Sequence, residues 1–311
     1  MSANLKVRIG KLELANPVMV ASGTFGYAEE FTELLDLRKI GAIVSKTITL
    51  AGREGNPMPR TCETPCGMLN SIGLENPGIE RFLEQKLSYL ASLGSPIIVS
   101  VASENDPGEF AAMVKRLEKD SRVMAIELNI SCPNIKRARG KGQGSGLIAQ
   151  DPKATYSLVK SCRRFTRKTL ITKLSPNVTC ISEIALAAQA AGSDAVSLVN
   201  TFSGMSIDVQ AKRPKIACVV GGLSGPAIRP IALRMVWEVF QKIRIPIIGM
   251  GGIMDVQSAL EFFLAGSSAI SVGTANFVNP RVSLEIVRGI RDYLDKNKIK
   301  DIRSIVGALK L

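Results

Sequence analysis

The stretch AIELNISCPN, residues 125–134, places groups that could do chemistry directly behind a short apolar run. Its polar end carries two amides, a hydroxyl and a thiol, on Asn129, Asn134, Ser131 and Cys132, and the run then stops at a proline. A lone free cysteine usually behaves as a small core residue. The chain contains no histidine, so Ser–His and Cys–His nucleophile pairs are excluded. Any general base must be a cysteine, lysine, tyrosine or carboxylate.

Two lysines stand in runs that are otherwise apolar, Lys46 in IVSKT and Lys173 in LITKLS. Burying a lysine is costly unless its ammonium group meets an anion. A surface lysine is the alternative, but the apolar neighbours of both residues argue against exposure. In a flavin site, a lysine beside the N1–O2 edge would stabilise the anionic reduced ring.

Four asparagines lie near predicted strand ends or in a long connection, and a threonine follows the last of them. They are Asn70, Asn129, Asn134 and Asn200, with Thr201. An amide both donates and accepts hydrogen bonds, so it can pair with the alternating N–H and C=O edges of a planar heterocycle. One asparagine is usually a turn residue, but four are more than turns require.

Glycine-rich segments follow the last two predicted strands, GMGGI at 249–253 and SVGTANF at 271–277. Exposed backbone N–H groups there can wrap a phosphate, and barrel proteins often bind phosphate after these two strands. The alternative is tight turns that merely need glycine. We interpret GGLSGPAI, residues 221–228, as a third glycine-rich turn near strand six.

The composition limits the classes of protein to which this chain could belong. The chain has 311 residues, 46% of them hydrophobic, with a net charge of +13 and a pI near 9.6, so its surface attracts anions. The densest basic cluster, residues 135–146, has no interleaved aromatic residues, which argues against nucleic-acid binding. No apolar run approaches the roughly 20 residues that span a bilayer. The N-terminus shows no signal-peptide pattern, and we expect a cytoplasmic protein.

The six cysteines are scattered, and only Cys62 and Cys66 lie close together in the sequence. A zinc site needs further cysteine or histidine ligands. We therefore expect no metal in this chain.

Eight short apolar runs alternate with helical patterns along the chain. Most are rich in valine and isoleucine and run continuously, as strands buried on both faces do. We expect a (β/α)8 barrel rather than a doubly wound open sheet, because polar residues follow nearly every run. The runs are residues 16–24, 41–47, 96–103, 125–131, 170–175, 195–201, 245–252 and 269–275.

The whole chain, residues 1–311, reads as a single catalytic domain. VRIGKLELANP, residues 7–17, predicts a β-hairpin before the first barrel strand. The connection from Thr47 to Pro96 is too long for a plain loop between strand and helix, and we expect it to contribute to the site over the C-terminal face.

Together these segments resemble the class 1 dihydroorotate dehydrogenases, and most of all the class 1B catalytic subunit. The resemblance covers nearly the whole chain. The motifs that carry it are NPVMVASGTFGY, VSKTIT, GMLNSIGLENPG, LNISCPN, KLSPNVT, SLVNTFSGM, GGLSGPAIRPIALRMV, GMGGI and GSSAISVGTANF.

The resemblance implies oxidation of dihydroorotate to orotate with FMN, in pyrimidine biosynthesis. Cys132 would take the C5 proton while a hydride leaves C6 for flavin N5, and a thiol suits this because its pKa can be tuned toward neutrality. Substrate contacts are implied for Lys46, Asn70, Ser71, Ile72, Gly73, Leu74, Asn129, Asn134, Asn200 and Thr201. FMN contacts are implied for Ser22, Lys46, Thr47, Ser100, Asn129, Lys173, Val199, Gly225, Gly251, Gly252, Gly273 and Thr274.

Class 1B resemblance further implies a partner subunit that carries FAD and a 2Fe–2S cluster and passes electrons to NAD+. A homodimer of catalytic chains with two such partners, a heterotetramer, is the expected assembly. The chain itself lacks the cysteine set for such a cluster and a GxGxxG loop for a dinucleotide.

Three features depart from the family pattern. Ser100 stands where the family usually has asparagine, the segment after SCPN is longer and more basic, and Glu75 replaces a common glutamine. Other readings are a fumarate-using class 1A enzyme, a dihydropyrimidine dehydrogenase-like activity on uracil, and a barrel that binds a phosphate ligand without catalysis.

Overall fold

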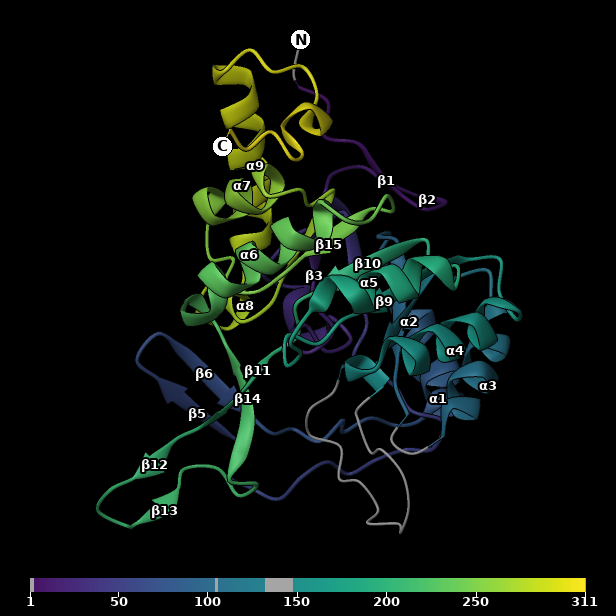
Figure 1. Ribbon diagram of the computed structural model, residues 1–311, viewed down its shortest axis with the longest axis vertical. Helices are drawn as coiled ribbons and strands as arrows, with labels where there is room; N and C mark the ends of the chain where they lie inside the picture. The colour runs from purple at the N-terminus through teal and green to yellow at the C-terminus, as the bar shows by residue number, and fades with distance from the viewer. Residues whose placement is uncertain (1–2, 104–105, 132–147, 311) are drawn as a thin grey trace.

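The computed structural model describes residues 3–103, 106–131 and 148–310. Eight parallel strands close into a barrel, in the ring order β10-β15-β16-β3-β4-β7-β8-β9. The barrel lies at the centre of the molecule, where Figure 1 labels β3, β9, β10 and β15. This confirms the predicted (β/α)8 barrel against the open sheet. The barrel strands are β3 (Val18–Val20), β4 (Ala42–Val44), β7 (Ile97–Val101), β8 (Ala125–Asn129), β9 (Thr169–Lys173), β10 (Ala195–Leu198), β15 (Ile247–Gly249) and β16 (Ala269–Val272).

Helices surround the barrel and alternate with its strands. Local sequence signals start several of them: Asp106, Asp151 and Asp255 each accept a backbone N–H of the following first turn. The helices are α1 (Ile79–Arg81), α2 (Leu87–Ser92), α3 (Pro107–Glu118), α4 (Pro152–Arg163), α5 (Ile181–Ala190), α6 (Arg229–Phe240), α7 (Val256–Leu264), α8 (Ala275–Val278) and α9 (Val282–Lys296), with a π-helical segment at Phe82–Lys86 joining α1 to α2.

Single turns of 3-10 helix complete the helical segments, at Glu29–Phe31, Leu37–Lys39, Ile148–Gln150, Pro226–Ile228 and Ile302–Ile305. Within the described residues, no helix is long and apolar enough to cross a membrane.

The predicted N-terminal hairpin is confirmed, with β1 (Val7–Ile9) antiparallel to β2 (Leu12–Leu14). A second sheet, not anticipated from the sequence, projects from the barrel with the order β11-β14-β6-β5 (Figure 1). It joins the long connection after β4 to the segment after β10. Its strands are β5 (Thr61–Thr64), β6 (Gly67–Asn70), β11 (Phe202–Met205) and β14 (Val220–Ser224), and beyond it β12 (Ile207–Asp208) pairs with β13 (Arg213–Pro214).

The expectation that residues 221–228 form one glycine-rich turn is therefore wrong for their first half. Gly221 and Gly222 lie inside β14, between β11 and β6. A side chain at Gly221 would meet the carbonyl oxygen of Asn70 at 2.8 Å, and one at Gly222 would collide with Thr201. Without side chains, Gly221 and Gly222 allow β14 to approach Asn70 of β6 and Thr201 closely. Of the glycines in this segment, only Gly225 lies in a turn.

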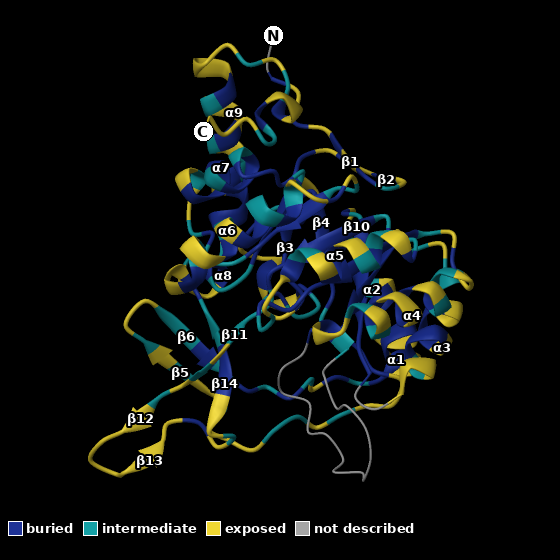
Figure 2. Ribbon diagram, viewed as in Figure 1, coloured by how far each residue is buried: buried dark blue, intermediate teal, exposed yellow. Residues whose placement is uncertain are grey.

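The core lies in the barrel and under the helices that cover it, where the ribbon is dark blue in Figure 2. Every residue of the barrel strands is buried, which explains their continuous apolar runs. Packing is tight at the end of β15: a Cβ on Gly249 would lie 2.5 Å from the Phe262 ring and would also collide with the Ser267 hydroxyl.

We expect Gly249→Ala to lower the free energy of unfolding by about 1–3 kcal/mol, because the added methyl overpacks this corner of the core. Urea titration of the purified protein without added ligand measures it. The matched control is Gly23→Ala, since a Cβ at Gly23 meets no atom within 4 Å. Equal stabilities of the two variants would contradict the packing described here.

Candidate active site

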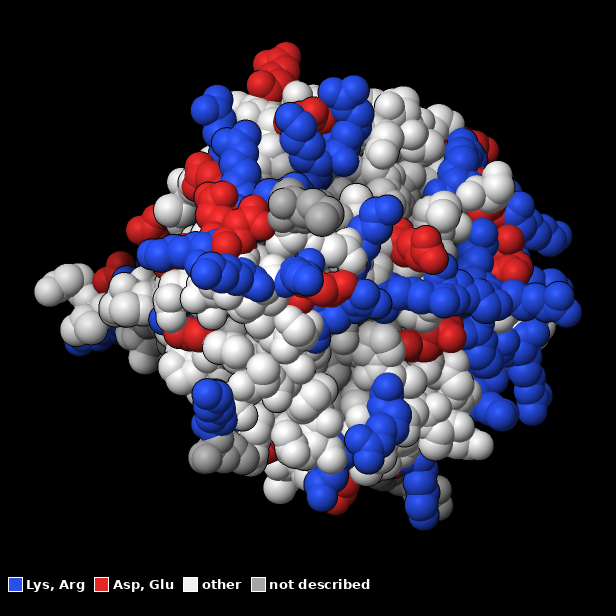
Figure 3. Space-filling view, turned by 90° about the horizontal axis from the view of Figure 1, so that it is seen from above, with Lys and Arg blue, Asp and Glu red and all other residues white. Residues whose placement is uncertain are grey.

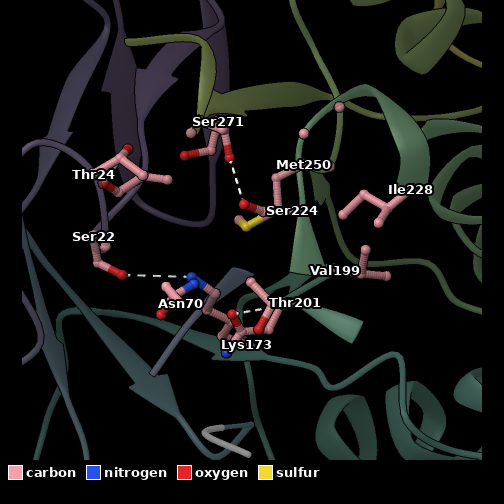
Figure 4. A pocket seen from close by; sticks show the side chains of 18 of the residues that line it. Ser22, Thr24, Asn70, Lys173, Val199, Thr201, Ser224, Ile228, Met250 and Ser271 are labelled. Carbon is pink, nitrogen blue, oxygen red and sulfur yellow. Dashed lines mark hydrogen bonds between the residues drawn. The ribbon is translucent and has the colours of Figure 1, made fainter. Parts of the chain in front are cut away.

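A cavity opens at the carboxyl ends of the barrel strands, with about 1090 Å³ of space including the part that is open to solvent (Figure 4). Among the described residues, all barrel strands except β7 supply a wall residue at or just after their last position. Those wall residues are Ser22, Lys46, Asn129, Lys173, Val199, Met250 and Gly273. The long connection after β4 closes one side, as expected, through Asn70, Ile72, Gly73 and Leu74.

The cavity brings together most of the residues singled out in the sequence. Its wall includes Ser22, Lys46, Thr47, Asn70, Ile72, Gly73, Leu74, Asn129, Lys173, Val199, Asn200, Thr201, Gly225, Gly251, Gly252, Gly273 and Thr274. Cys132 and Asn134 lie outside the described residues, as does the basic segment 135–146. Their roles stay predictions.

Two residues of the predicted set do not reach the cavity wall, Ser71 and Ser100. Ser71 is fully buried behind the wall, where its backbone N–H bonds the carbonyl of Arg60 at 2.7 Å. Ser100 points into the barrel, where its hydroxyl bonds Thr47 and Glu127, each at 3.0 Å. Ser100 can therefore act on the cavity only through those neighbours.

Sequence reasoning missed part of the wall. Ala21, Gly23, Thr24, Ser224, Ile228, Met250, Ile253, Met254, Ser271 and Ala275 also line the cavity. Several of these residues are next to predicted site residues in the sequence, so considering a longer stretch of sequence after each strand could have identified them. Ile228 and Met250 carried no signal, because an apolar residue facing a ligand looks like one facing the core.

Hydrogen bonds fix the amides of the cavity floor. The Asn129 amide donates to Thr47 Oγ1 at 3.2 Å, and its carbonyl oxygen accepts from the Ser131 hydroxyl at 2.9 Å. The Asn200 amide donates to Ser131 Oγ at 2.8 Å. Ser131, directly before Cys132 in the sequence, thus ties together amides from β8 and from the segment after β10. A fixed array of this kind can read the edge of a flat polar ring.

Lys173 is buried at the end of β9, and its ammonium is held by few protein groups. Its Nζ donates to Ser22 Oγ at 3.4 Å, as Figure 4 shows, and lies 4.0 Å from the Glu127 carboxylate. An ammonium has three donors. Among the described residues it therefore keeps hydrogen-bonding capacity for a group in the cavity.

At the other end of the cavity the backbone forms a cradle of glycines. Gly225, Gly251 and Gly252 have φ of 96°, 123° and 77°, a region that residues with side chains rarely adopt. Within the described residues, the backbone N–H groups of Gly252 and Gly273 have no protein acceptor. The nearby Ser271 hydroxyl is buried and likewise has no partner in this part of the chain. These free donors fit a phosphate.

Lys46 lies on the side of the cavity formed by the long connection. Burial lowers the pKa of Lys46, because desolvation disfavours the ammonium form; Glu75 opposes this shift and Arg60 adds to it. Arg60 and Glu75 themselves form an ion pair. Lys46 is thus a partly buried cationic side chain that can bind an anionic ligand.

The molecular surface supports attraction of anions. Lysine and arginine side chains outnumber acidic ones on the face shown in Figure 3 and are densest at one edge. The net charge of +13 raises the local concentration of negatively charged ligands around the protein.

Comparison with known proteins agrees with the geometry of the cavity. A family model described as dihydroorotate dehydrogenase matches residues 4–294. A protein of Trichlorobacter lovleyi named dihydroorotate dehydrogenase B (NAD(+)), catalytic subunit, is 51% identical over 310 residues, which is 100% of both chains. Proteins of the same name from Thermoanaerobacter pseudethanolicus and Bacteroides thetaiotaomicron are each 49% identical, over 99% of this chain and 99% and 100% of their own.

We expect Lys46→Met to stabilise the protein without bound ligand at neutral pH, because the half-buried ammonium is costly. The pKa of Lys46 is lower in the folded chain than its ordinary value of 10.5. Below both the folded and the unfolded pKa of Lys46, the ammonium destabilises the folded protein to its full extent. This destabilisation disappears as the pH rises from the folded pKa to the unfolded pKa. The gain in melting temperature should therefore shrink toward pH 10.5.

Thermal melts across this pH range measure the effect, with the exposed Lys119→Met as the matched control. A gain that is independent of pH, or a loss of stability, would contradict the electrostatic account of Lys46.

Proposed function

Because this chain belongs to the dihydroorotate dehydrogenase family, we propose that it oxidises dihydroorotate to orotate with bound FMN, in pyrimidine biosynthesis. The observation that supports the proposal is one cavity whose wall holds an amide array, a glycine cradle and the buried Lys173, which keeps donor capacity among the described residues. A flat polar ring with a phosphate tail can use all three features.

FMN would accept the hydride, and the residues present fit its parts. The glycine cradle around Gly252 and Gly273, with the Ser271 hydroxyl, suits the phosphate. Lys173 would face the edge of the ring that becomes negative on reduction. Val199 and Met250 supply apolar surface.

The substrate would occupy the side of the cavity that the long connection closes. Lys46 would bind the carboxylate, and Asn70, Asn129, Asn200 and the undescribed Asn134 would hold the amide edges of the ring. Cys132, the residue after Ser131, would take the C5 proton as a thiolate while the hydride leaves C6, so that the C5–C6 double bond of orotate forms. The substrate thus loses one proton and one hydride.

The relatives are named as NAD(+)-linked catalytic subunits, which supports a partner chain as the electron acceptor. We propose that residues 1–311 act as one FMN-binding catalytic domain in a homodimer. An electron-transfer subunit with FAD and a 2Fe–2S cluster would bind each chain and reduce NAD+. The cytoplasmic location stays a prediction from the sequence.

Identification of the flavin tests the cofactor assignment. We expect acid-released flavin from the purified chain to be FMN, at one per chain, and added orotate to perturb its absorbance, because both ligands share one cavity. A colourless protein that takes up no added FMN, or one that holds only FAD, would refute the assignment.

We expect Cys132→Ala to keep FMN but to lose about 10²–10⁴-fold in turnover, since a positioned base contributes that much. Cys162→Ala is the matched control: this thiol lies on the buried face of α4, and burial raises its pKa to about 12. Steady-state oxidation of dihydroorotate with an artificial acceptor measures both variants. Near-normal turnover of Cys132→Ala would remove Cys132 as the base.

A further inference from the structure

Glu127 is a carboxylate in the interior of the barrel, and the proposed chemistry does not use it. It lies in the middle of β8, it is 3% exposed, and it is absent from the cavity wall. A buried charge without compensation is costly, so its presence between the apolar Ile126 and Leu128 calls for a reason.

Both oxygens of this carboxylate are held by hydroxyl groups from the barrel wall. Ser100 Oγ, from β7, donates to Oε1 at 3.0 Å, and Ser197 Oγ, from β10, donates to Oε2 at 3.0 Å. Ser100 and Ser197 are fully buried. These contacts fix where the negative charge lies.

The charge of Glu127 faces Lys173. Their closest atoms, Lys173 Nζ and Glu127 Oε1, are 4.0 Å apart, and both side chains are nearly inaccessible to water. Among the described residues, no other carboxylate is within ion-pair distance of Lys173. Ser22, which accepts from Lys173 at 3.4 Å, and Ser197, its register partner on β10, are neutral. Glu127 is therefore the counter-charge of this ammonium group.

We propose that Glu127 is a positioning residue that acts through Lys173: its fixed negative charge keeps Lys173 as an ammonium group at the flavin ring before reduction begins. Negative charge that develops on the ring then meets a positive charge already in place, and no proton has to arrive at the lysine. The inference rests on the proposed function, because it concerns the flavin site.

The number of protons taken up on reduction tests this role. Two electrons and one proton convert oxidised FMN to its anionic reduced form. In Glu127→Gln, Lys173 would begin uncharged and take up a second proton when the ring becomes negative. We expect the wild-type holoenzyme to take up one proton per two electrons, and Glu127→Gln to take up two.

The measurement is anaerobic electrochemical reduction in weak buffer with a pH indicator, so that no chemical reductant releases protons, at a pH where free reduced flavin is anionic. Ser197→Ala is the matched control, since it removes one hydrogen bond to Glu127 and leaves the charge. It should take up one proton, as should the double variant Glu127→Gln/Lys173→Gln. One proton in Glu127→Gln would overturn the proposal.

Unfolding of the flavin-free protein gives a second test that does not need the cofactor. Removing one member of a buried pair destabilises strongly, whereas removing both costs less. We expect Glu127→Gln to lower the melting temperature and the added Lys173→Gln to raise it again. Additive losses, or failure of both variants to fold, would leave Glu127 a structural residue only and overturn the proposal.

The two tests separate this inference from the proposed function. If the chain binds no FMN, the proposed function fails while the thermal cycle still shows whether the two charges are coupled. If the cycle shows coupling but Glu127→Gln takes up one proton, the pair is structural and the role at the flavin is wrong.

Discussion

Closure of the parallel barrel is the constraint on which the rest of the structure depends. Eight strands that run in one direction around a ring must bring their carboxyl ends to one face. The side chains at those ends then converge although they come from segments as far apart as Ser22 and Gly273. Inside the ring there is room for few side chains, so the buried Glu127 and Lys173 face each other across neighbouring strands. The cavity and the charged pair beneath it are two consequences of one closed sheet.

Much of this arrangement could be predicted from the sequence, because a strand buried on both faces leaves a continuous apolar run and ends in polar residues. The hairpin and all eight barrel strands lie in the predicted segments, except that β9 begins one residue earlier, at Thr169. The second sheet could not be predicted, since its pairing joins Asn70 to Gly222, 152 positions away. Glu127 was missed because a pattern of burial does not say which residues of such a strand point into the barrel. The roles of Cys132 and Asn134 stay predictions.

The cavity also shows how binding and stability oppose each other. The desolvated ammonium of Lys46 and the hydroxyl of Ser271, which has no partner among the described residues, both cost folding free energy without a ligand. A bound anionic ligand satisfies such groups and stabilises the folded state by an amount that rises with the logarithm of its concentration relative to its Kd. By contrast, Glu127 is satisfied by the protein alone, through Ser100 and Ser197, which fits a residue that sets the charge of the site rather than contacting a ligand.

The central claim is that this cavity oxidises dihydroorotate at a bound flavin. The most direct test is anaerobic mixing of the purified, flavin-loaded chain with dihydroorotate while the long-wavelength absorbance of the flavin is followed. The account predicts bleaching within the mixing experiment, with about one orotate formed per flavin, and return of the absorbance when an electron acceptor is added. A chain that holds FMN but stays oxidised in excess dihydroorotate would contradict the substrate assignment.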